Sequence, residues 1–137
     1  MDKEKMRAVG QWLHKAQHDL RSAHRLYTDD PPLLDTAAYH CQQAAEKALK
    51  GYLTLHDIQF RKTHLLAPLV AECAKLDYQF HELAEAAAKL TPYATEFRYP
   101  GEGLDPEESD VAEAMQLAQT VVEFVMRRLP CDLTGKA

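Results

Sequence analysis

The sequence has little of what disulfide-bonded, sheet-based or membrane-spanning proteins need. Its 137 residues include 5 glycines and 3 cysteines, and no segment approaches the roughly 18 consecutive apolar residues that a membrane helix requires. Cys41, Cys73 and Cys131 are widely spaced without a CxxC pair, which argues against a disulfide framework and a thiolate zinc site. The N-terminus lacks the apolar segment of a signal peptide. We therefore expect a soluble, cytoplasmic protein with no membrane partner.

Positive charge is also scarce. The chain carries 16 Lys and Arg residues against 21 Asp and Glu residues, which gives a formal net charge of −5. Such a balance argues against a protein that binds nucleic acid through its overall charge. Any site for an anion must therefore be local.

Ala, Leu, Glu, Gln and Lys are abundant instead, and apolar residues recur at steps of three and four, which predicts an all-α protein. The expected helices cover residues 3–27, a segment from the Asp-Asp-Pro-Pro sequence at 29–32 to 55, a short segment 63–76, residues 79–97 with a kink at Pro92, and a segment from Pro106 to 129. The connections are short, so we expect an antiparallel, up-and-down four-helix bundle with an extra short helix between the second and third long helices. One domain would cover residues 1–130, and residues 131–137 would form a short polar tail.

The usual signatures of metal and nucleophile sites are missing. His14 and His18 share one helical face, but His24 lies about 120° around the helix, so a third metal ligand is lacking. His40 and Cys41 point about 100° apart on a helix and do not form a Cys–His pair. No glycine-rich phosphate loop, GxSxG or HExxH motif occurs. We expect neither a metal nor another cofactor.

The polar face of the second helix is more informative. His40, Gln43, Lys47 and Lys50 share one face, beside a Gln42–Glu46 pair four residues apart. Such a face is typical of a solvated surface stabilised by side-chain pairs, and it also offers donors and positive charge to a ligand.

Two other segments carry local positive charge. Arg61, Lys62 and His64 precede the short helix. Arg98 and Tyr99 follow the fourth helical segment, where the guanidinium could bind a phosphate through two hydrogen bonds or could satisfy carbonyls of its own helix.

Three segments together carry a resemblance to a known family. They are AYHCQQAAEKALK at residues 38–50, THLL at residues 63–66 and FRYPG at residues 97–101, and they are preceded by a matching pattern of Trp12, Ala16, Asp19 and Leu20. With these features the chain resembles the HEPN domain family (higher eukaryotes and prokaryotes nucleotide-binding) over nearly its whole length.

The resemblance implies an all-α bundle that commonly dimerises and often works beside a minimal nucleotidyltransferase in a two-component, toxin–antitoxin-like pair. Many members are metal-independent ribonucleases, in which an Arg is followed four to six residues later by a His at a composite site in the dimer interface. Arg98 matches this Arg, but residues 99–105 contain no His. The general acid–base partner of the family's ribonucleases is therefore missing from its place.

We therefore expect a non-catalytic or catalytically reduced module that binds a nucleotide, RNA or a nucleotidyltransferase partner. The expected binding residues are Gln43, Lys47, Lys50, Arg98 and Tyr99. One alternative is a ribonuclease toxin that uses Arg98 with a displaced histidine, His64. Another is a purely structural dimerising bundle without a ligand.

Two more expectations concern the surface. Acidic residues follow Arg98 and would repel an RNA backbone, which favours a smaller ligand or a protein partner; they are Glu102, Asp105, Glu107, Glu108 and Asp110. We also expect a homodimer that buries either the Ala-rich helix faces or the aromatic end formed by Tyr93, Phe97 and Tyr99.

Overall fold

The computed structural model describes residues 2–97, 100–101 and 105–134. All regular structure in these residues is helical, which confirms the predicted all-α bundle. The elements are α1 (Lys3–Tyr27), α2 (Leu34–Leu55), α3 (Leu66–Leu76), the 3₁₀ helix η1 (Tyr78–Leu83), α4 (Ala84–Leu90), the 3₁₀ helix η2 (Thr91–Ala94), α5 (Glu108–Met126) and α6 (Cys131–Thr134). In the part of the chain that the structure describes, no helix is both long and apolar enough to cross a membrane.

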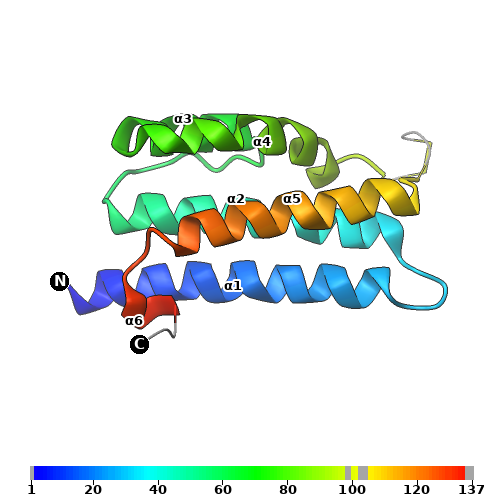
Figure 1. The fold of residues 1–137 in the computed structure, drawn as a ribbon, viewed down its shortest axis with the longest axis horizontal. Helices are drawn as coiled ribbons and strands as arrows, with labels where there is room; N and C mark the ends of the chain where they lie inside the picture. The colour runs from blue at the N-terminus through cyan, green and yellow to red at the C-terminus, as the bar shows by residue number, and fades with distance from the viewer. Residues whose placement is uncertain (1, 98–99, 102–104, 135–137) are drawn as a thin grey trace.

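The helices are arranged in layers (Figure 1). α1 lies along one side, α2 and α5 form the middle, and α3 and α4 cover the opposite side. α2 packs against α1, α3, α4 and α5, which makes it the central element. Its side chains, polar ones included, are therefore enclosed to an extent that a surface helix would not show.

α1 has the predicted bounds, because its signals are local. The Asp2 carboxylate accepts the Glu4 backbone N–H at 2.9 Å, which caps the N-terminus. The apolar stripe of Val9, Leu13 and Ala16 is buried against the rest of the bundle. Unbroken helical periodicity between two capped ends is sufficient to define this element.

α2 begins at Leu34, after the two prolines of residues 31 and 32, slightly later than the predicted start. Its small residues are buried under neighbouring helices of the same chain: Ala37, Ala38, Cys41, Ala44, Ala45 and Ala48. The close approach of α1 continues at Gly51, where an added Cβ would lie 3.1 Å from Trp12 Cβ. The Ala-rich face of α2, one of the two expected dimer seams, is therefore covered by helices of the same chain.

The segment predicted as one kinked helix over residues 79–97 is divided in the structure. A 3₁₀ helix begins after Asp77, whose carboxylate accepts the Gln79 backbone N–H at 3.0 Å. α4 then ends at Leu90, and Pro92 lies in the first turn of η2. The expected interruption at Pro92 is present, but the third long helix is broken rather than bent.

The C-terminal part contains the last long helix and one further turn. α5 begins at Glu108, where the side chains of Glu107 and Asp110 form a reciprocal capping box. Residues 131–134, expected in a polar tail, form α6. Leu133 packs against the core and lies near Gly10 of α1, so this segment covers part of α1.

Candidate functional site

The polar face of α2 is largely inside the protein. Gln42, Gln43, Glu46 and Lys50 are each at most 7% exposed. Buried polar groups are costly unless they are hydrogen-bonded. Among the described residues no buried side-chain polar atom lacks a partner, so these groups form complete networks.

Glu46 is the centre of the first network. One carboxylate oxygen accepts Lys50 Nζ at 3.0 Å, and the other contacts Gln42 Nε2 at 3.1 Å and His64 Nδ1 at 2.9 Å. Burial by itself raises the pKa of Glu46, but the hydrogen bonds from His64, Lys50 and Gln42 together outweigh it and lower the pKa. Glu46 is therefore held as a carboxylate inside the bundle.

Two glutamines extend this network. Gln43 Nε2 donates to Gln42 Oε1 at 2.7 Å, and Gln42 Nε2 also donates to the His64 carbonyl oxygen at 2.8 Å. α2 is thereby tied to the segment that precedes α3.

Lys50 closes the network on its other side. Its ammonium lies 5.8 Å from the Trp12 ring centroid and 5.5 Å from that of Phe60, and the two rings meet edge to face at 6.0 Å. These are cation–π distances. Since Glu46 and two aromatic rings already surround this ammonium, a ligand could reach Lys50 only by opening the network.

Asp19 of α1 is the centre of a second network. It is 4% exposed, and its two oxygens contact His40 Nδ1 at 2.7 Å and Lys47 Nζ at 2.6 Å. Burial raises its pKa, but the hydrogen bonds and charges of these two partners prevail, so the pKa is lowered. The side chains of His40 and Lys47 are 27% and 24% exposed. This carboxylate therefore holds a cation and an imidazole at the surface between α1 and α2.

The structure thus separates the residues predicted for one binding face. Lys47 is partly accessible, His64 is 62% exposed at its side chain, and Gln43 and Lys50 are buried. Arg98 and Tyr99 lie outside the described residues. On the predicted face of α2, His40 and Lys47 are therefore partly accessible, whereas Gln43 and Lys50 are internal.

Sequence reasoning missed the role of the two carboxylates. Asp19 lies three residues after buried Ala16 and four before buried Ala23. This spacing places it on the apolar stripe of the helix, and it could have indicated that Asp19 is buried. Helical spacing presents Glu46 only as a helix-stabilising partner of Gln42. Its contacts with His64 join segments 18 residues apart and could not be read from helical periodicity.

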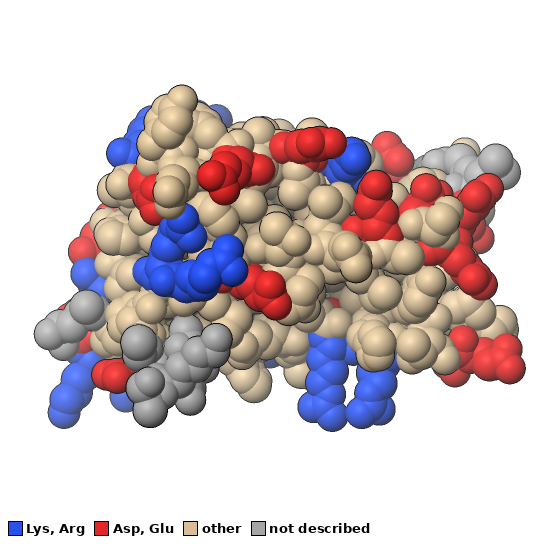
Figure 2. Space-filling view, in the orientation of Figure 1, with Lys and Arg blue, Asp and Glu red and all other residues tan. Residues whose placement is uncertain are grey.

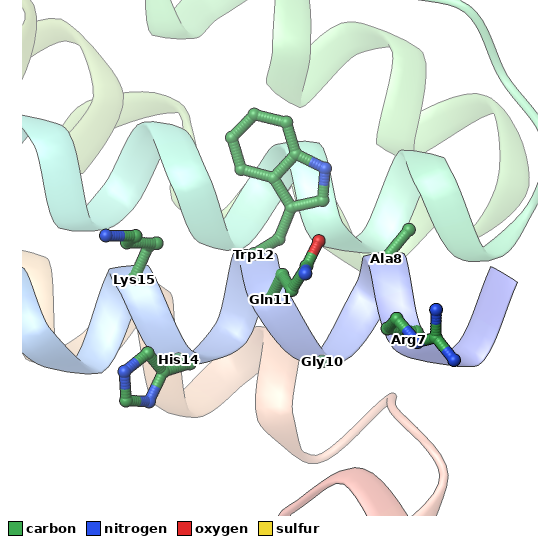
Figure 3. Close-up of a pocket in the computed structure, with 7 residues that line it drawn as sticks. All are labelled: Arg7, Ala8, Gly10, Gln11, Trp12, His14 and Lys15. Carbon is green, nitrogen blue, oxygen red and sulfur yellow. The ribbon is translucent and has the colours of Figure 1, made fainter. Parts of the chain in front are cut away.

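Two hollows open along α1. The first, the α1–α2 groove, has a volume of about 520 Å³ and is lined by His18, Arg21, Ser22, Arg25, Leu26, Thr36 and His40. The second lies around the N-terminal half of α1, where Trp12 points towards α2 while Arg7, His14 and Lys15 extend in other directions (Figure 3). Both hollows carry basic side chains on a chain whose net charge is −5.

The charge distribution is uneven (Figure 2). Acidic side chains gather at the end of the bundle where α5 begins, and basic side chains project along the edge formed by α1. Glu107, Glu108 and Asp110 at the start of α5 are exposed, as the repulsion of RNA predicted for this region requires.

The side chains offer little for metal or thiol chemistry. In the described ranges no cluster of three His, Cys, Asp or Glu residues could hold a metal ion. Cys41 and Cys73 are buried, and burial raises the pKa of each thiol to about 12. Neither thiol is therefore activated as a nucleophile.

Comparison with known proteins agrees with the fold and the sequence pattern. The HEPN domain profile matches residues 9–129. Among solved structures, the chain is similar to TT1696 from Thermus thermophilus, with 31% identity, a TM-score of 0.74, and coverage of 88% of this chain and 98% of that one. It is also similar to ST0689, described as an archaeal HEPN homologue, with 25% identity, a TM-score of 0.70, and coverage of 88% and 96%. A search of the curated proteins finds no significant match.

The profile covers most of the chain, and the helices that it matches are those that build the two carboxylate-centred networks. The chain therefore belongs to the HEPN domain family.

Proposed function

We propose that this chain is a non-catalytic HEPN module that binds a nucleotide or RNA and acts as the partner of a minimal nucleotidyltransferase in a two-component, toxin–antitoxin-like system. The observation that carries the proposal is the sequence after Arg98, where residues 99–105 contain no His. The family's ribonuclease chemistry needs that imidazole as general acid and base. A member without it keeps the bundle and its binding surface but lacks the catalytic pair.

The accessible part of the α2 polar face supports the binding role. Asp19 fixes His40 and Lys47 at the surface, so these groups lose little conformational freedom when they meet an anion. Arg98 is the further anion-binding residue of this proposal, with Tyr99 beside it in sequence. Lys50 contributes from inside, because its pairing with Glu46 maintains the geometry of α2.

The aromatic end supports a homodimer. Tyr93 and Phe97 are half-buried and their ring centroids are 6.0 Å apart, which leaves part of each ring available to a second copy. Static light scattering tests this part of the proposal, since we expect twice the mass of the 15.5 kDa chain. A monomer at every concentration would contradict it.

A first experiment tests the nucleotidyltransferase partnership. The genome is searched for a minimal nucleotidyltransferase gene adjacent to the gene for this chain, and absence of such a gene would count against the partnership. The two chains are then co-expressed and analysed by size exclusion. We expect co-elution, and we expect Arg98→Ala to weaken binding of partner or nucleotide by about 1.5–3 kcal/mol, the range for a hydrogen bond to a charged group. Lys at position 98 should restore only part of the affinity, because an ammonium lacks the planar fork of a guanidinium. Equal binding by the wild type and Arg98→Ala would remove Arg98 from the site.

One observation favours a second function. His64 is exposed, and Glu46 holds its Nδ1 atom, which leaves Nε2 free to exchange a proton with a substrate. A carboxylate orients catalytic imidazoles in this way. The ribonuclease alternative therefore uses Arg98 and His64, without a metal.

RNA cleavage in EDTA separates the two functions. If the chain is a ribonuclease, the purified protein cleaves RNA, and Arg98→Ala and His64→Ala each abolish cleavage. His81→Ala is the matched control, because His81 is an exposed histidine on η1 that contacts Tyr78 and carries no role in either proposal. Absence of cleavage, both alone and after release from the partner, supports the binding module.

A further inference from the structure

The α1–α2 groove carries two arginines that the function proposed above does not use. Arg21 and Arg25 lie one helical turn apart on α1 and both are exposed. Neither guanidinium makes a hydrogen bond or an ion pair within the described part of the chain. By contrast, Lys5, Lys47, Lys50, Lys75, Lys89 and Arg128 are all paired with carboxylates.

The residues around these guanidiniums are suited to an anion with several oxygens. No carboxylate lines the groove, whereas Ser22 supplies a hydroxyl and His40 an imidazole. Thr36 also lines the groove, and its hydroxyl contacts Asp35 Oδ1 at 3.4 Å. Asp19 engages Nδ1 of His40, so Nε2 is the nitrogen left for a ligand. Thr36 belongs to the first turn of α2, where the helix dipole favours negative charge.

Asp19 contacts the lining residue His40, and Asp35 precedes the lining residue Thr36 in sequence. Asp19 is 4% exposed and both of its oxygens have partners. Asp35 lies beside Thr36, but its Oδ1 accepts the Thr36 backbone N–H at 2.8 Å. Neither group lines the groove, although Asp35 reduces the positive potential at one edge.

The end of α1 does not need these arginines. A basic residue near a helix C-terminus often satisfies the last carbonyls. Here the Thr28 hydroxyl contacts the carbonyl oxygens of His24 and Arg25, at 2.9 and 3.3 Å, and the Thr28 backbone N–H also donates to His24. The guanidinium of Arg25 is therefore left for another acceptor.

We propose that the α1–α2 groove binds the phosphate chain of a nucleotide. The guanidinium groups of Arg21 and Arg25 on α1 bind the phosphate oxygens, and Thr36 and His40 of α2 form the opposite wall of the groove. Guanidinium groups pair with phosphate oxygens through two parallel hydrogen bonds, and two of them match a ligand with two adjacent phosphates. Leu26 gives the groove an apolar surface next to these cations. The inference deepens the proposed nucleotide-binding function and rests on it, but it assigns the phosphates to residues other than Arg98.

The test uses the full chain and inorganic pyrophosphate as the probe. Binding is measured by isothermal titration and by amide shifts of the ¹⁵N-labelled protein at about 0.15 M salt, where the screening length is about 8 Å. We expect shifts at Ser22, Leu26 and Thr36, and we expect Arg21→Gln/Arg25→Gln to weaken binding about 100-fold, a factor of about ten for each charge-assisted contact. Both sites are exposed and Gln is a good helix former, so this variant should keep its fold.

The matched control is Arg7→Gln/Lys15→Gln. It removes the same charge from the same helix, at exposed residues of the other hollow. We expect less than about a twofold change, because screening weakens charges that do not touch the ligand. Equal weakening by the two double variants would mean that pyrophosphate follows overall charge, and it would overturn the proposal.

Titrations with two further compounds, ADP and glutarate, define the ligand and separate this inference from the proposed function. ADP should bind at least as tightly as pyrophosphate, and glutarate should bind much more weakly. Equal binding of glutarate, or no shift in the groove with pyrophosphate, would refute a phosphate site. If ADP binds the wild type and Arg21→Gln/Arg25→Gln equally well, the groove assignment fails while nucleotide binding stands. If ADP does not bind at all, the groove assignment and nucleotide binding by this chain both fail.

Discussion

Replacing Glu46 with alanine tests whether the α2 network is a buried structural element. The change leaves the Lys50 ammonium, whose side chain is 9% exposed, with two aromatic rings and no counter-charge. Removing one partner of a buried ion pair costs about 3–5 kcal/mol of unfolding free energy. We expect the lower end, about 3 kcal/mol, because His64 is 62% exposed and water reaches that side of the site.

Urea unfolding followed by circular dichroism measures this cost. With a slope of about 2 kcal/mol per molar urea, the midpoint should fall by about 1.5 M. The matched control is Glu72→Ala, which breaks the exposed Lys75–Glu72 pair on α3. Such pairs contribute about 0.2–1 kcal/mol, so its midpoint should fall by at most about 0.5 M.

A double variant separates loss of the pair from loss of volume. Glu46→Gln/Lys50→Met removes both charges and keeps side chains of similar size. Its loss of unfolding free energy should therefore be smaller than the sum of the losses in Glu46→Gln and Lys50→Met. If Glu46→Ala is no more destabilising than Glu72→Ala, or if the two single changes are additive, the network does not stabilise the bundle as argued.

The pH dependence of stability provides an independent test of the same site. The pKa of Glu46 is lowered from its ordinary value of 4.5 by the hydrogen bonds from His64, Lys50 and Gln42, which outweigh the opposing effect of burial. A lowered folded-state pKa gives stability that is present above the ordinary value and is lost as the pH falls through the lowered one. The urea midpoint of the wild type should therefore fall below about pH 4.5, and Glu46→Gln should flatten part of this fall.

Other measurements test the packing and the absence of metal chemistry. In Gly51→Ala the new Cβ would lie 3.1 Å from Trp12 Cβ, a contact that costs about 1–3 kcal/mol, and the gain of about 0.5–1 kcal/mol from replacing a helical glycine offsets part of it, so the net loss of stability should be at most about 2.5 kcal/mol. In Gly10→Ala the Cβ would meet Leu133 at an ordinary 3.6 Å, so this variant should be more stable than the wild type by about 0.5–1 kcal/mol. Thermal unfolding that ranks the two variants the other way would contradict the packing. Cys41 and Cys73 should react with a thiol reagent only at the rate of unfolding, since burial raises each pKa to about 12; rapid labelling of both in native buffer would disprove this. EDTA should leave the circular dichroism spectrum and ADP binding unchanged, and stoichiometric zinc in the purified protein would disagree with that expectation.

Local signals were sufficient for several parts of the fold. The bounds of α1 follow from uninterrupted periodicity between Asp2 and Thr28, and the break at Pro92 follows from the missing backbone N–H of proline. The predicted start of α5 near Pro106 is also close, because Glu107 and Asp110 form a cap within one turn. These features depend only on residues within a few positions of one another.

Other parts depended on contacts between distant segments. The 3₁₀ helix η1 was not predicted, and its Phe80 is fully buried between Tyr52 and Phe124, with ring centroids 4.5 and 4.9 Å away. Contacts of the Phe80 ring with two other helices can favour the tighter 3₁₀ conformation, which the local sequence would not predict. Leu133 likewise packs against the core because α6 lies next to Gly10 of α1.

The sequence by itself determined that this chain forms an amphipathic helical bundle with the HEPN pattern, and it placed His40, Gln43, Lys47 and Lys50 on one face of one helix. Only the tertiary structure decided which of these side chains meets water. Helical periodicity predicts the direction in which a side chain points, whereas the burial of that side chain depends on which other elements pack against that face. α1 brings Asp19 to His40 and Lys47, and α1 and the segment before α3 bring Trp12 and Phe60 over Lys50. The same face therefore has partly exposed side chains at His40 and Lys47 and buried ones at Gln43 and Lys50.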